Sequence, residues 1–194
     1  MRNANYIGLA YQFWNLTRES IVEMEKLNNK NLVLSDHNPN LSEEENWELY
    51  ANKTRWNDFN VGVPILFNFY HGLELIMKGL LQEIHQLPRN KSHKLSDYYS
   101  LLVDNEVTFG SEIINLIGNF INANNPFSDF FTSNNGDVND FYIYLRYPEP
   151  TNESKEYSYK EIRGNEMLGL RKFLIIKNGC SVIKIAIEKW KKEI

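Results

Sequence analysis

The stretch that most constrains this chain is Asn60–Gln86, in which apolar residues recur at spacings of three and four. That period is typical of a helix with a wide buried face. The apolar positions are Leu66, Phe69, Tyr70, Leu73, Ile76, Met77, Leu80 and Ile84. Because so wide a face contacts other elements on more than one side, we expect one long central helix. Pro64 is best tolerated in a first turn, so regular helix is expected to begin near Gly62.

The other side of this expected helix carries a narrow polar stripe. Its members project within about 60° of His71 on a helix of 3.6 residues per turn. They are Asn60, Asn68, His71, Glu74, Lys78, Gln82 and His85. Spacings of three, four and seven bring His71, Glu74 and Lys78 within side-chain reach of one another.

Two interpretations of the stripe remain open. It is either the solvated face of an amphipathic helix, or a partly covered group that forms a hydrogen-bonded network or a binding site. Solvated faces usually carry many Lys and Glu residues, whereas this stripe has one of each, beside histidines and amides. Phe67 and Leu75 also fall inside it, so we expect the stripe to be partly covered.

Other stretches also show helical periodicity or helix-capping signals. We expect further helices over Asn5–Leu27, Ser42–Trp56, Ser96–Val103, Ser111–Asn122 and Asn165–Lys192. Ser42 followed by Glu45 is a capping box, and Trp47, Tyr50 and Ala51 of that helix should face inward. Asn165 is the expected N-cap of the last helix.

The segments between these helices contain turn-forming residues or lack a helical period. Loops are expected over Asn28–Asn40, Asn124–Gly136 and Thr151–Gly164, and the segment Asp137–Pro150 can begin as helix before its prolines end it. The sequence therefore predicts an all-α fold. We expect a helical bundle of four to five main helices, with a long central helix and an irregular loop before the C-terminal helix.

Length and composition bound the organisation of the chain. Its 194 residues fit one domain, with N-terminal helices and a loop over 1–60 and a core over 61–194. The formal net charge of −4 gives no overall attraction for nucleic acid, although a local basic groove is compatible with it. Cys180 is the single cysteine and has apolar helical neighbours, which predicts a buried structural thiol and fits a reducing cytoplasm.

Several classes of site and location are excluded by the motif search. No glycine-rich phosphate loop and no serine nucleophile elbow is present, and the four histidines lack the spacings of zinc sites. His71 and Glu74 stand in the reverse order to the Glu-x-x-His pairs of di-iron bundles. We therefore expect no metal and no cofactor. No apolar run approaches a membrane span and no signal segment is evident, so we expect a cytoplasmic protein.

Three short segments, in this order, resemble motifs of the HEPN superfamily of small helical-bundle domains. His71–Leu81 (HGLELIMKGLL) is similar to the family's second-helix signature, in which a Glu is followed four residues later by a Lys. Ser92–Leu102 (SHKLSDYYSLL) resembles the His-x-Leu segment that opens the next helix. Tyr144–Pro148 (YLRYP) resembles the Arg-Tyr-Pro segment before the last long helix. The resemblance covers roughly residues 62–190, with insertions.

The resemblance implies a bundle of four or five helices that forms a homodimer. It also implies a place in a prokaryotic toxin–antitoxin or phage-defence system, with a cognate antitoxin or defence partner. Many members are metal-independent ribonucleases, and others are inactive modules that bind RNA or nucleotides. Active members carry an Arg followed, after four to six residues, by a His. This chain departs from that pattern, because Arg146 is followed at those distances by Thr151, Asn152 and Glu153.

Arg146 lies in an aromatic run, where a guanidinium can stack on rings or pair with an acid from another helix. Glu74 is the expected partner, since the resemblance brings the two motifs together. One interpretation is a structural ion pair that holds the loop to the bundle. The other is an anion pocket in which Arg146 and Lys78 hold a phosphate and Tyr147 stacks on a base.

The candidate residues follow from these two interpretations. The expected ligand-binding residues are His71, Glu74, Lys78, His93, Arg146 and Tyr147. His71, His93 and Arg146 are the candidates for catalysis. Either histidine would carry the proton near neutral pH, and Arg146 would hold the phosphate. The function expected is binding of RNA or a nucleotide. The alternative is a non-catalytic module for protein interaction or dimerisation.

Overall fold

The computed structural model describes residues 4–30, 37–89, 92–148, 156–163 and 167–193, and within these ranges it is helical without strands. The fold is therefore all-α, as the sequence predicts. The elements in chain order are α1 (Tyr6–Lys26), α2 (Glu43–Thr54), α3 (Asp58–Glu83), α4 (Leu95–Asp104), α5 (Glu106–Phe109), α6 (Ser111–Ile121), α7 (Ser128–Ser133), the 3-10 turn η2 (Val138–Asp140), α8 (Phe141–Tyr144) and α9 (Met167–Glu193).

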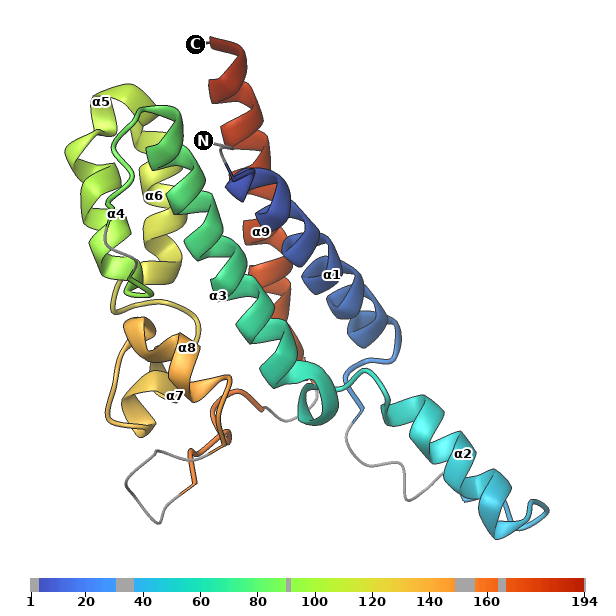
Figure 1. Cartoon of the computed structure of the whole chain (residues 1–194). Coiled ribbons are helices and arrows are strands. Elements are labelled where there is room, and N and C mark those ends of the chain that lie inside the picture. The colour runs from blue at the N-terminus through green and yellow to red at the C-terminus, as the bar shows by residue number, and fades with distance from the viewer. Residues whose placement is uncertain (1–3, 31–36, 90–91, 149–155, 164–166, 194) are drawn as a thin grey trace.

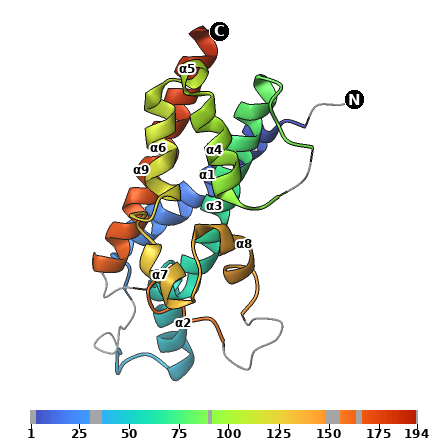
Figure 2. The same cartoon turned by 90° about the vertical axis from the view of Figure 1, so that its left-hand side faces the viewer.

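Helix α3 is the centre of the bundle. In Figure 1 it lies between α1 on one side and α4 and α6 on the other, with α9 behind it. The quarter-turn view in Figure 2 shows α4 and α6 side by side above α7 and α8. Fifteen of the 26 residues of α3 are buried, which confirms the expected wide apolar face.

The contact between α1 and α3 depends on two glycines of α3, seven residues apart. A Cβ added at Gly72 would come within 2.4 Å of the indole nitrogen of Trp14, and one at Gly79 would meet Ile7 at 2.4 Å. Ile7 and Trp14 are themselves seven residues apart on α1, so two large side chains fit over two residues that have none. The Trp14 indole also donates a hydrogen bond of 3.1 Å to the carbonyl of Phe69.

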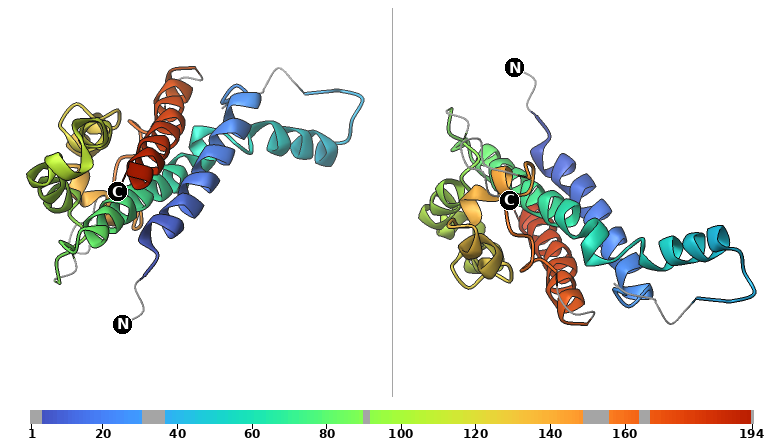
Figure 3. Two further views of the ribbon diagram at one scale, coloured as in Figure 1. Left: turned by 90° about the horizontal axis from the view of Figure 1, so that it is seen from above. Right: turned by 90° about the horizontal axis from the view of Figure 1, so that it is seen from below.

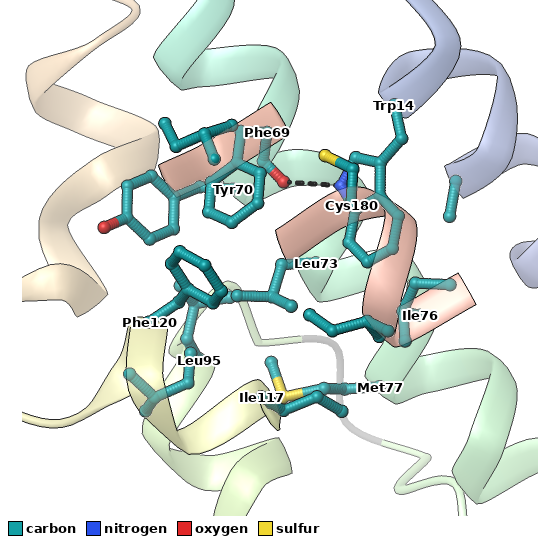
Figure 4. Packing of buried hydrophobic residues seen from close by; sticks show 14 of the residues in the cluster. Trp14, Phe69, Tyr70, Leu73, Ile76, Met77, Leu95, Ile117, Phe120 and Cys180 are labelled. Carbon is teal, nitrogen blue, oxygen red and sulfur yellow. Dashed lines mark hydrogen bonds between the residues drawn. The ribbon is translucent and has the colours of Figure 1, made fainter. Parts of the chain in front are cut away.

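The core combines side chains from α1, α3, α4, α6 and α9, as Figure 4 shows in close-up. Phe69 packs edge-on against Phe120 of α6, with ring centroids 4.8 Å apart. Cys180 of α9 is buried, and this burial raises the pKa of its thiol. The expected structural role for this cysteine is consistent with its position. No helix in the described ranges is both long and apolar enough to cross a membrane.

Helix α2 is the exception to this packing. Both views in Figure 3 show it projecting away from the other helices, and Thr54 is its one buried residue. The capping box of Ser42 and Glu45 forms as predicted. The prediction that Trp47, Tyr50 and Ala51 face inward is wrong, because Trp47 is 64% exposed and Ala51 is also exposed. A pattern along one helix cannot tell whether another element exists to cover it.

The start of α3 also differs from the prediction. The helix begins at Asp58 rather than near Gly62, so Pro64 lies in its second turn. Two side chains explain the earlier start. Asn57 accepts a hydrogen bond from the amide of Asn60, and Asn29 accepts one of 2.7 Å from the amide of Asp58. These bonds satisfy donors that every helix N-terminus otherwise leaves unpaired.

The remaining boundaries agree with the prediction to within a few residues, and three short elements are additional. Helix α7 lies in the segment expected to be a loop, α5 follows α4, and η2 precedes the expected turn of helix α8. In the loop before α9, residues 156–163 contain neither helix nor strand. The rest of that loop and the expected N-cap Asn165 lie outside the described residues.

Candidate functional site

The candidate site is centred on the carboxylate of Glu74, whose side chain is only 1% exposed. One oxygen, Oε1, accepts a hydrogen bond from Lys78 Nζ, one turn further along α3. The same oxygen lies 3.0 Å from Nδ1 of His93, which comes from the segment before α4. The buried carboxylate therefore binds a lysine of its own helix and a histidine of the segment before α4.

The other carboxylate oxygen faces His71. Glu74 Oε2 and His71 Nδ1 are 3.5 Å apart, and both atoms are buried without a hydrogen bond to the described residues. His71 is held between aromatic rings. Phe67 stacks on it with centroids 5.7 Å apart, and Phe13 of α1 meets it edge-on at 4.7 Å. This packing fixes the plane of the imidazole, with Nδ1 toward the carboxylate of Glu74.

The charge state of Glu74 follows from these contacts. Burial by itself would raise the pKa of this carboxyl, because a low-dielectric surrounding disfavours a charge. The side chains of His71 and Lys78, together with the charges of Lys78 and His93, outweigh burial and lower the pKa below its ordinary value. Glu74 also raises the pKa of Lys78, despite the partial burial of that amine. The carboxylate and the ammonium thus stabilise each other in their charged forms.

The segment that carries His93 is held in place by Tyr98 of α4. The Tyr98 hydroxyl donates to the carbonyl of Ser92 at 2.8 Å and accepts from the amide of Ser92 at 3.2 Å. The ring of Tyr98 also lies under the Lys78 ammonium, 5.0 Å from its centroid. Tyr98 is 2% exposed, so a core residue sets the position of both partners of Glu74.

The outer layer of the site is a stack that starts at His93. The imidazole lies parallel to the ring of Tyr142, with centroids 4.0 Å apart. Tyr142 lies on α8, and its hydroxyl accepts a hydrogen bond from Arg146, one turn later. The guanidinium of Arg146 then sits 5.0 Å from the Tyr142 ring and 5.4 Å from the Tyr147 ring.

Helix α8 is only four residues long, and its position depends on Phe141. That ring is fully buried and packs against Phe67 and Tyr70 of α3, with centroids 6.4 and 5.8 Å away. Anchoring Phe141 in the core leaves the next residue, Tyr142, on the outer side over His93. The burial of Phe141 therefore places the aromatic run of α8 next to the residues that contact Glu74.

The predicted site residues are thus brought together, with one correction. His71, Glu74, Lys78 and His93 meet directly, and Arg146 with Tyr147 lies at the outer edge. The expected ion pair between Arg146 and Glu74 does not form. Arg146 is exposed and contacts Tyr142, while the carboxylate is enclosed by residues of α3 and the segment before α4. Burial of Glu74 leaves no route for the guanidinium.

Sequence reasoning missed the residue that links the two halves of the site. Tyr142 contacts both His93 and Arg146, whereas the sequence shows it only as one ring of the aromatic run around Arg146. A signal was present, since Tyr142 and Arg146 are four residues apart and share one helix face when the backbone is helical. The contact to His93 has no such signal, because it depends on how α8 docks.

The arrangement supplies cations and hydrogen-bond donors at the surface above a carboxylate that is already paired. Among the residues that the structure describes, no acid pairs with Arg146. No group of three or more His, Cys, Asp or Glu side chains in those ranges is placed to hold a metal. The guanidinium of Arg146 is a group suited to binding an anion. The imidazole of His93, whose side chain is 51% exposed, is a group suited to proton transfer.

Comparisons with other proteins add no assignment to this geometry. No protein-family model, no curated protein and no solved structure matches the chain.

Proposed function

We propose that this chain is a HEPN-like domain that binds RNA or a nucleotide through a phosphate held at the surface above Glu74. The observation that carries the proposal is the stack of His93, Tyr142 and Arg146. Arg146 offers an exposed guanidinium with no acidic partner in the described ranges, and guanidinium groups match phosphate geometry. Tyr147 is 48% exposed beside it, which suits stacking on a base.

Electrostatics support an anionic ligand in this place despite the net charge of the whole chain. Glu74 is neutralised by Lys78, so the buried carboxylate does not repel an anion at the surface. Protonation of His93 or His71 would add positive charge beneath a bound phosphate. A ligand phosphate would therefore meet Arg146 and His93 first, with Lys78 and His71 behind them.

If this domain is an enzyme, the reaction we propose is metal-independent RNA cleavage. The carboxylate of Glu74 accepts from Nδ1–H of His93, which leaves Nε2 of the neutral imidazole as the proton acceptor. A histidine oriented by a buried carboxylate in this way is suited to general acid–base chemistry. The resemblance to the HEPN superfamily also supports a homodimer, a cytoplasmic location and a role in toxin–antitoxin or phage-defence systems with a cognate partner.

The test is RNA binding and RNA cleavage by the purified chain in EDTA. We expect Arg146→Ala to lose most of the affinity for a short RNA while keeping the wild-type melting temperature, because Arg146 is exposed. His93→Ala should abolish any cleavage, and His37→Ala is the matched control, since His37 is exposed near α2. Wild-type RNA affinity in the Arg146→Ala variant would remove the basis for the proposal.

A second candidate function, a protein-interaction module, is favoured by helix α2. This helix of 12 residues buries only Thr54, and isolated helices of such length are marginally stable in water. Trp47 is exposed on it and packs edge-on against Tyr50, with ring centroids 5.8 Å apart. If this surface joins two copies, Trp47→Ser should convert a dimer to a monomer in sedimentation velocity. A wild-type chain that sediments as a monomer would exclude self-association through α2.

A further inference from the structure

A second concave site lies away from Glu74, between α4, the connection from α6 to α7, and η2. Its volume is about 410 Å³, which is within the range of small-molecule sites. Asn122, Ala123 and Asn125, which follow α6, form one side of it, and residues 136–139 form the other. None of the residues that line it belongs to the Glu74 cluster.

The floor of this pocket is apolar. Ile121, Phe131 and Val138 line it and are each less than 10% exposed. Tyr99 of α4 lies at the side, partly exposed, with its hydroxyl 3.4 Å from the carbonyl of Ile114. A flat ring could therefore lie against apolar atoms on entering the pocket.

The walls carry hydrogen-bonding groups that are free to bind a ligand. Asn139 accepts the amide of Ser96 through its side-chain oxygen at 2.9 Å, and its NH₂ group makes no bond to the described residues. The side chains of Asn122 and Thr132 likewise have no hydrogen-bond partner in the described ranges. The side-chain oxygen of Asn125, in contrast, already accepts hydrogen bonds from the hydroxyl of Tyr70 and the amide of Phe127.

The charge of the lining selects among ligands. Among the described residues, Asp137 is the one charged side chain of the lining, and none of them that lines the pocket is Lys, Arg or His. One oxygen of Asp137 accepts from the amide of Asn139 at 2.7 Å, which keeps the carboxylate at the pocket edge. A phosphate would meet repulsion here without a compensating cation. An uncharged ligand with several donors would not.

We propose that this pocket binds an uncharged, flat-ringed small molecule rich in hydrogen-bonding groups, of the ribonucleoside class. The ring would rest on the apolar floor, while Asn139, Asn122 and Thr132 would bond to its polar edge and its sugar. Asp137 would accept a hydroxyl or an amino group. The site is separate from the surface above Glu74, so it does not depend on the proposed phosphate binding.

The experiment is calorimetric titration of the full chain with the four common ribonucleosides, their 5′-monophosphates and free ribose. We expect at least one nucleoside to bind, and its monophosphate to bind on the order of tenfold more weakly, because the described part of the lining has a carboxylate and no cation. Asp137→Asn keeps the oxygen that caps η2 and should remove most of that discrimination. Heat from ribose equal to that from the nucleosides would overturn the assignment to this class.

Variants assign any binding to this pocket. Ala123 is exposed and lines the pocket, so Ala123→Trp should fill the space without disturbing the core and should abolish nucleoside binding. Asn122→Ala should weaken binding, whereas Asn124→Ala, an exposed neighbour outside the lining, should not. Nucleoside affinity that survives Ala123→Trp, or no binding by the wild type, overturns the proposal. Nucleotide binding lost in Arg146→Ala but retained in Ala123→Trp belongs to the Glu74 site instead.

Discussion

Removing the charge of Glu74 should lower the free energy of unfolding far more than removing the charge of an exposed glutamate would. Glu74→Gln keeps the volume of the side chain, so the change leaves no cavity. It leaves the Lys78 ammonium, whose side chain is 14% exposed, without its anion. Breaking a buried ion pair by removing one member costs about 3–5 kcal/mol. For a chain of this size, that corresponds to a melting temperature lower by roughly 6–20 °C.

The assay is urea unfolding at neutral pH for Glu74→Gln, Lys78→Met and the double variant. We expect the double variant to be more stable than the sum of the single effects predicts, by about 1–3 kcal/mol, because no unpaired charge remains. The matched control is Glu25→Gln. That residue pairs with Lys177 between α1 and α9, but their side chains are 47% and 28% exposed, so we expect a loss below about 1 kcal/mol.

One result would refute this reasoning. If the two single effects add to within about 0.5 kcal/mol, Glu74 and Lys78 do not depend on each other for stability. A cost for Glu74→Gln no larger than for Glu25→Gln would lead to the same conclusion, because burial would then make no difference to the pair.

Other perturbations test the packing and the electrostatics. Gly72→Ala should lower the free energy of unfolding by about 1–3 kcal/mol through overpacking against Trp14, and denaturant unfolding beside Asn124→Ala measures it. Since folding lowers the pKa of Glu74, its contribution is present above the ordinary carboxyl value of 4.5 and is lost as pH falls below it. Wild-type stability should therefore decline more steeply than that of Glu74→Gln between pH 5 and pH 3, and parallel curves would contradict the cause given. Tyr142→Phe should weaken RNA binding less than Tyr142→Ala, because phenylalanine keeps the stack on His93, and fluorescence anisotropy separates the two variants.

Part of the site could be predicted because helical periodicity brings its members together. His71, Glu74 and Lys78 are three and four residues apart, so any α-helix through this stretch places them on one face. Their partial covering was also predictable from Phe67 and Leu75 within the stripe. His93 entered through the resemblance of its segment, since a distance of 19 residues along the chain carries no geometric information about its contact with Glu74.

By itself, the sequence determined the all-α class, the main helices, the capping box of Ser42 and the chemistry of the polar stripe. These follow from interactions between residues one or two turns apart, which act wherever the helix lies. Only the tertiary structure decided that Glu74 is buried, that Arg146 bonds to Tyr142 instead, and that α2 projects with Trp47 exposed. Those outcomes depend on which surfaces meet, and a buried carboxylate is shielded from a distant cation by the side chains that enclose it.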